Sequence, residues 1–136
     1  MHNNEQLIIK FYKAFSKRDY KTMNDCYSGD IAFFDPVFGL LKGNMVRAMW
    51  QMLCTNAKDF SLTFGNIQLL DEEYATCEWQ ASYTFSKTGR KVVNKIKAHM
   101  RFADGKIIEH SDAFSLHKWS KQALGFSGWL LGWNSF

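Results

Sequence analysis

The sequence predicts an α+β fold in which a curved antiparallel sheet wraps around N-terminal helices. Two periodicities support this prediction. Apolar residues recur at helical spacing in the first part of the chain, and they alternate with polar residues from residue 58 onward. The third observation is the pair Asp104-Gly105, a hairpin turn between two alternating segments. A curved sheet with helices on its concave side encloses a cone, whose interior is the expected ligand site.

Three helices are expected before the sheet. Residues 5–17 form the first, and its apolar stripe consists of Leu7, Ile8, Phe11 and Phe15. Asp19 begins a short second helix, whose inner side consists of Met23, Cys26 and Tyr27. The third begins near Asn44, and its apolar stripe consists of Val46, Met49, Trp50 and Leu53. One-sided stripes of this kind indicate packing on a core.

A short strand is expected between the second and third helices. The letters SGD at residues 28–30 indicate a turn, and residues 31–35 form an apolar strand that Pro36 ends. Gly39 and Gly43 then flank a segment that we expect to be a tight loop over the mouth of the cone.

The sheet is expected to consist of long antiparallel strands. The first of them contains residues 61–70, with a bulge at Gly65-Asn66 where the alternation slips. The inward positions of the next three strands are Ala75, Cys77, Trp79, Ala81, Tyr83 and Phe85, then Ile96, Ala98, Met100 and Phe102, then Ile108, His110, Asp112 and Phe114. A last helix runs from about Ser115 to Gly125, and the aromatic tail after it is expected to pack on the body or on a partner.

Composition predicts one domain over residues 1–136 in the cytoplasm. The three cysteines, Cys26, Cys54 and Cys77, lack metal-ligand spacing and are expected to be buried thiols in a reducing compartment. No signal peptide or membrane span is expected, and membrane contact by the tail is a weak alternative. The net charge is only +4, without a broad basic stripe, so nucleic-acid binding is not expected.

Asp35 is the first candidate site residue. It lies in the stretch FFDPVFG, where apolar residues and the only proline of the chain surround a carboxyl group. Apolar surroundings raise the pKa of a carboxyl group toward the range of a general base. An Asp before Pro is also a common turn residue that bonds nearby backbone N–H groups. Both interpretations stay open at this point.

His110 and Asp112 form the second candidate group. They are two residues apart in a strand, so both point to the same face, about 6.6 Å apart along the chain. Facing inward, they can act as a base and its orienting partner. The alternative is a buried polar pair that a Tyr or Trp satisfies. A metal site is not expected, because two candidate ligands lack a third.

The chain resembles the nuclear transport factor 2-like superfamily, within it the SnoaL-like and ketosteroid-isomerase-like proteins. The segments that carry this resemblance are FYKAFSKRDYKTMNDCYSGDIAFFDPVFGLLKG and HMRFADGKIIEHSDAFSLHKWSKQALG. The resemblance implies the cone-shaped fold, no cofactor, and pairing of two copies through the outer face of the sheet. That outer face carries Thr76, Glu78, Gln80, Ser82 and Thr84, and we expect a homodimer.

The resemblance assigns roles to several residues. In ketosteroid isomerases the base position falls on Asp35, but the two oxyanion donors fall on Phe11 and Ala98, which have no donor group; Tyr12 is one position off. Steroid isomerisation is therefore not expected. In SnoaL-type polyketide cyclases the base position falls on Asp112. Epoxide hydrolases of this superfamily need an arginine, and Arg101 is expected on the outer face instead.

Two functions follow from these assignments. The first is a cofactor-independent cyclase or isomerase that removes a proton next to a carbonyl group of a small hydrophobic molecule. Its catalytic residues are expected to be Asp35, His110 and Asp112, and its ligand-binding residues Phe11, Phe15, Phe33, Trp50, Trp79, Tyr83, Ala98 and Met100. The second is a non-catalytic ligand-binding or dimeric interaction module with the same fold.

Overall fold

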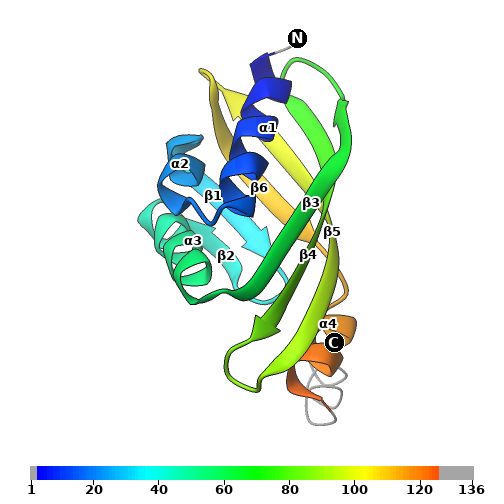
Figure 1. Ribbon diagram of the computed structural model, residues 1–136. Helices are drawn as coiled ribbons and strands as arrows, with labels where there is room; N and C mark the ends of the chain where they lie inside the picture. Colours follow the sequence, from blue (N-terminus) through cyan, green and yellow to red (C-terminus); the bar gives the residue numbers. More distant parts are fainter. Residues whose placement is uncertain (1–2, 126–136) are drawn as a thin grey trace.

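The computed structural model describes residues 3–125 (Figure 1). Its helices are α1 (Asn3–Ser16), α2 (Tyr20–Asp25), α3 (Asn44–Asn56) and α4 (Leu116–Leu124). Its strands are β1 (Tyr27–Asp35), β2 (Gly39–Lys42), β3 (Lys58–Leu69), β4 (Tyr74–Phe85), β5 (Arg90–Ala103) and β6 (Lys106–Ala113). The predicted α+β fold is confirmed.

The strands form one curved sheet in the order β2-β1-β6-β5-β4-β3. Figure 1 shows α1, α2 and α3 on one side of this sheet, and α4 near the hairpin end of β4 and β5. The neighbouring strands are antiparallel, except that β1 and β6 run parallel. A parallel pair needs a long crossover connection, and here the elements from β2 to β5, with α3 among them, supply it.

The alternation read from the sequence places the core correctly. The inward positions of β4 and β5 are buried at Ala75, Cys77, Trp79, Ala81, Ile96, Ala98, Met100 and Phe102. On α1, Ile8, Phe11 and Phe15 are buried beneath the sheet, as their spacing predicts. The register of β3 and β4 shifts between Gly65 and Gln68, which confirms the bulge. In β6 the buried isoleucine is Ile107 and not Ile108, because the pairing with β5 shifts there.

The segment before Asp35 differs from the prediction. Residues 28–30 are not a turn, and Tyr27 does not belong to the second helix, because β1 begins at Tyr27. The backbone N–H of Ile107 donates to the carbonyl of Cys26, and Tyr27 pairs with Ile107, with a register shift before Ala32. The predicted loop after Gly39 is strand β2, paired with β1. Pairing between distant segments overrides the local turn signal in both places.

Helix α4 covers a free edge of the sheet. Strand β6 ends opposite Lys97, so among the described residues the first part of β5 has no strand neighbour on that side. There the Val93 backbone N–H donates to Gln122 of α4 at 2.8 Å, and Arg90 donates to the Gln122 carbonyl at 2.7 Å. Covering an edge in this way prevents unwanted strand pairing. The helix begins and ends as predicted, with Ser115 as its N-cap and Gly125 as its C-cap.

Three further predictions concern the cysteines, membrane spans and the C-terminal tail. The three cysteines are buried free thiols, as expected. Within residues 3–125, no helix is both long enough and apolar enough to cross a membrane. The prediction for the aromatic tail concerns residues 126–136, which lie outside the described part of the chain.

Candidate functional site

A row of four buried side chains crosses the inner face of the sheet, and it includes two carboxyl groups. Cys77 of β4 pairs with Ala98 of β5, and Ala98 pairs with Asp112 of β6. Phe34 of β1 pairs with Ser111, so Asp35 and Asp112 follow at the next positions of two parallel strands. All four positions, Cys77, Ala98, Asp112 and Asp35, are buried. The sheet thus brings Asp35 next to the predicted pair on β6.

His110 and Asp112 belong to a buried hydrogen-bonded chain of five side chains. Nε2 of His110 lies 2.8 Å from Oδ1 of Asp112, and Nδ1 lies 2.8 Å from the hydroxyl of Tyr27. The Trp50 indole donates to that hydroxyl at 2.9 Å, and the Trp79 indole donates to Oδ1 of Asp112 at 3.3 Å. Both tryptophans, predicted as pocket walls, are therefore also hydrogen-bond donors.

The chain of donors selects one tautomer of neutral His110. An indole N–H can only donate, so the Tyr27 oxygen accepts from Trp50 and its own hydrogen goes to Nδ1 of His110. Nε2 then carries the ring hydrogen and donates it to the carboxylate of Asp112. Both nitrogens of His110 are engaged, so the imidazole orients Asp112 and leaves no nitrogen open to a ligand.

Asp35 is both a turn residue and a buried carboxyl group, the two interpretations that the sequence left open. Its Oδ1 accepts from the backbone N–H of Val37 at 2.9 Å and of Phe38 at 2.6 Å, as a turn residue does. Its side chain is nevertheless buried. Burial raises the pKa of Asp35 to about 6, the charge of Asp112 adds to this rise, and the two backbone N–H groups and His110 oppose it. Asp35 therefore titrates close to neutral pH.

Aromatic rings fill the space around these groups. The rings of Phe33, Phe11 and Trp50 surround His110, with ring centroids 5.0, 5.6 and 6.4 Å away. Phe15 lies 5.0 Å from Trp50 and 5.2 Å from Trp79. The predicted ligand-binding residues Phe11, Phe15, Phe33, Trp50, Trp79, Ala98 and Met100 are all buried on this side of the sheet. In the structure they pack on one another.

Tyr83 is the predicted wall residue that remains partly exposed. Its hydroxyl accepts from the Trp119 indole of α4 at 2.8 Å. Burial raises the pKa of Tyr83; the bond from Trp119 lowers it, and the charge of Asp35 raises it. Tyr83 therefore lies within electrostatic reach of Asp35, between the interior and α4.

Sequence reasoning missed two tyrosines of the interior. Tyr27 shares the odd positions of Ile31, Phe33 and Asp35, so extending the predicted strand back past Gly29 reaches it. The apparent turn at residues 28–30 concealed this signal. Tyr12, one position off the donor position that the resemblance gives, was not among the predicted site residues, yet its side chain is 0% exposed and it lies within electrostatic reach of Asp112.

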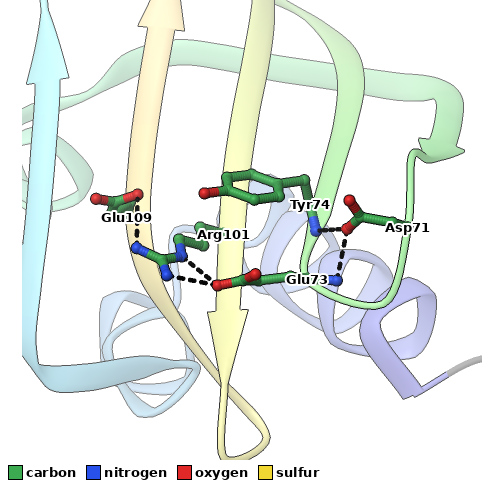
Figure 2. Close-up of polar contacts among 5 residues, drawn as sticks. All are labelled: Asp71, Glu73, Tyr74, Arg101 and Glu109. Carbon is green, nitrogen blue, oxygen red and sulfur yellow. Dashed lines mark hydrogen bonds and ion pairs between the residues drawn. The ribbon is translucent and has the colours of Figure 1, made fainter.

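The outer face of the sheet carries a separate hollow of about 300 Å³. Its apolar lining includes Phe34, Leu40, Leu70 and Tyr74, four side chains that are substantially exposed. Arg101 lies at its edge as predicted for the outer face, with its guanidinium 5.6 Å from the Tyr74 ring centre. Figure 2 shows this arginine between Glu73, to which Nε donates at 2.6 Å, and Glu109, with Nη1 at 3.8 Å.

No metal centre is apparent among residues 3–125. This part of the chain contains no group of three or more His, Cys, Asp or Glu side chains that could hold a metal ion. The titratable side chains of the interior include carboxyl, imidazole and phenol groups, which can take part in acid–base chemistry.

The sequence matches a known domain family over most of its length. The family model of the SnoaL-like domain matches residues 8–110. The chain belongs to the SnoaL-like family. The matched segment contains Asp35 and His110 and ends just before Asp112. No curated protein sequence matches this SnoaL-like chain.

Solved structures share the fold of this SnoaL-like domain. A nuclear transport factor 2-like protein of unknown function from Burkholderia pseudomallei is 22% identical, with a TM-score of 0.73 over 84% of this chain and 92% of that one. A proposed polyketide cyclase from Xanthomonas campestris is 18% identical, with a TM-score of 0.73 over 88% and 96%. An LEH-like epoxide hydrolase from M. tuberculosis is 16% identical, with a TM-score of 0.71 over 96% and 91%. At such identities the likeness concerns the fold alone.

Proposed function

We propose that this SnoaL-like domain acts on a small, largely apolar carbonyl compound and removes a proton from the carbon next to the carbonyl group, without a cofactor. The observation that carries the proposal is the meeting of Asp35, His110 and Asp112 at adjacent inner positions of β1 and β6, in apolar surroundings. Ionisable groups gathered in such an environment are typical of functional sites.

Asp112 is the base in this proposal. His110 and Trp79 both bond to Oδ1, which orients the carboxylate and leaves Oδ2 to accept the proton. His110 is a positioning residue, because Asp112 and Tyr27 occupy its two nitrogens.

Asp35 is the acid in this proposal. Its pKa of about 6 keeps a protonated fraction available near neutral pH, so that it can return a proton to the substrate. Two neighbouring carboxyl groups in different environments commonly divide the roles of acid and base. The interior is filled by side chains, so a substrate must displace some of them, and Tyr83 is the partly exposed one within reach of Asp35.

The test is exchange of the acidic carbon-bound hydrogen with solvent deuterium, followed by proton NMR. The substrates are 1,3-diketones ranging from one ring to three rings. We expect exchange faster than in buffer alone, and a loss of about 100-fold or more in Asp112→Asn. Asp104→Asn is the matched control, because Asp104 is exposed in a hairpin turn that also accepts Asn-Gly. Equal rates in Asp112→Asn and in the control would refute the role of Asp112.

A non-catalytic module is the second candidate, and the outer hollow favours it. The hollow is open and apolar, whereas the inner polar groups are enclosed by rings. If the protein is such a module, the His110–Asp112 pair only stabilises the fold, and the outer face of the sheet binds a partner. The same diketones would then show no exchange beyond the buffer rate with any variant.

We propose further that the outer face pairs two copies of the chain. The face carries charges of both signs: at the hollow, Arg101 pairs with Glu73 and Glu109, and farther along β5 the exposed Lys95 and Lys97 lie beside β4, where Glu78 pairs with Lys97. In the proposed pair, a two-fold axis across the strands would place the lysines of each copy over the carboxylates of the other. Lysine stems also cover apolar surface while their charged ends stay in water.

A further inference from the structure

The end of the molecule that carries α4 is strongly basic. Figure 1 shows α4 beside the hairpin that joins β4 and β5. The Thr88 hydroxyl donates to the carbonyl of Ala123, and Arg90 donates to that of Gln122, so the hairpin and the helix form one surface. The exposed cations of this surface are Lys87, Arg90, Lys91, Lys118 and Lys121. Among residues 3–125, only Lys91 of these five forms an ion pair.

The segment that follows α4 in the sequence has the opposite character. Residues 126–136, which lie outside the described part of the chain, include no charged residue. Their large apolar members are Phe126, Trp129, Leu130, Leu131, Trp133 and Phe136. Gly125 ends α4 so close to Arg90 that a Cβ at this glycine would lie 3.3 Å from the guanidinium. The apolar segment therefore continues the chain directly from the basic surface.

A basic surface joined to an apolar aromatic segment fits the surface of an anionic membrane. Lysine and arginine are attracted to acidic lipid headgroups, and tryptophan prefers the depth at which headgroups meet acyl chains. Either signal alone gives weak, reversible binding, whereas two signals together give stable attachment. Nucleic acid would be attracted by the same cations and could stack on the tryptophans, but it gives no role to Leu130 and Leu131.

We propose that this end of the molecule binds the surface of anionic membranes. The five cations contact the lipid headgroups, and the aromatic side chains of residues 126–136 enter the interface. Sequence alone left membrane contact by this segment as a weak alternative. The structure adds that the cations of two separate elements gather where the segment begins. The inference does not depend on the proposed reaction, although apolar substrates of the proposed kind dissolve in membranes.

The test is sedimentation of the full chain with lipid vesicles. We expect binding to vesicles of phosphatidylcholine that contain about one-third phosphatidylserine, and little binding to phosphatidylcholine alone. We expect release as the salt concentration rises, because salt screens exposed charges. Sedimentation with neither kind of vesicle, or equally with both, would refute the inference.

The decisive variant reverses two charges of α4, Lys118→Glu with Lys121→Glu. We expect its binding to the anionic vesicles to fall by at least about 25-fold, since each cation contributes about fivefold. The matched control is Lys10→Glu with Lys13→Glu, which reverses two exposed lysines at the same spacing on α1. The net charge changes equally in both variants. Equal losses would therefore indicate a general charge effect and would overturn the assignment to the α4 end.

A second variant tests the aromatic segment. Trp129→Ser with Trp133→Ser keeps every charge, and we expect it to weaken binding to the anionic vesicles by about 10-fold or more. Unchanged binding would mean that this segment does not enter the membrane, and the inference would be wrong. The melting temperature of each variant is measured beside that of the unaltered protein, whose own vesicle binding tests the inference independently of the variants.

Single-stranded RNA serves as a competitor in the same experiment. We expect it to leave the protein on the vesicles, because RNA offers no apolar interface to residues 126–136. Displacement of the unaltered protein from the vesicles, together with unweakened RNA binding by the tryptophan variant, would assign the basic end to nucleic acid and refute the inference.

Discussion

Nε2 of His110 lies 2.8 Å from Oδ1 of Asp112, and the two side chains are 0% and 3% exposed. Because this hydrogen bond is buried, it fixes the orientation of both side chains and contributes to the stability of the fold. The removal of one partner leaves the other buried without compensation.

Replacement of His110 should therefore be strongly destabilising. In His110→Ala, Asp112 and Tyr27 both lose a partner in the interior, and we expect the free energy of unfolding to fall by about 3–5 kcal/mol. Lys21→Ala is the control, because Lys21 is exposed on α2, away from the outer face of the sheet, and it should change stability by about 0.5 kcal/mol at most. Urea denaturation measures both. Similar losses in the two variants would contradict the importance assigned to the buried chain.

The hydroxyl of Tyr27 should determine the tautomer of His110. In Tyr27→Phe, Nδ1 of His110 and the Trp50 indole lose their shared partner, at a cost of about 1–3 kcal/mol. Nitrogen-15 NMR of the unaltered protein should show His110 with its hydrogen on Nε2 when neutral. Predominance of the Nδ1–H tautomer would refute the hydrogen-bonded chain as we describe it.

Asp35 should make the stability depend on pH in the acid range. Its pKa rises from 3.8 to about 6 on folding, so the folded state binds the proton more tightly than the unfolded state. Stability due to this group is therefore fully present below about pH 4, and is lost as the pH rises to about 6. In Asp35→Asn the loss should disappear, which makes the variant relatively more stable above pH 6 by about 1–3 kcal/mol. Unfolding curves at pH 4 and pH 7 test this, and equal pH dependence in both proteins would contradict it.

Assembly through the outer face should depend on charge. We expect a homodimer in sedimentation at micromolar concentration, weakened by salt because exposed charges contribute to it. The double variant Lys95→Glu with Lys97→Glu should be monomeric, since it places like charges opposite Glu73 and Glu109. Lys21→Glu, on the exposed side of α2, is the control and should still pair. A monomer for the unaltered protein would rule out this assembly.

The periodic parts of the chain were predictable from sequence alone. The alternation in β4 and β5 and the stripe on α1 state directly which side chains enter the core, because each repeat matches the geometry of one regular element. The same parity placed His110 and Asp112 inward and Arg101 outward. Asp35 was recognised as a candidate because an acid among apolar residues is unusual.

Only the tertiary structure decided what these residues bond to. Tyr27 becomes part of the site because β1 pairs with β6, a strand about 80 positions away, and no local pattern encodes that pairing. The tautomer of His110, the neighbouring places of Asp35 and Asp112, and the burial of Tyr12 all depend on contacts between distant segments. Sequence periodicity determines which face a side chain is on. The packing of α1 and four strands determines which groups meet there, because hydrogen bonds require angstrom-scale proximity that only the assembled sheet provides.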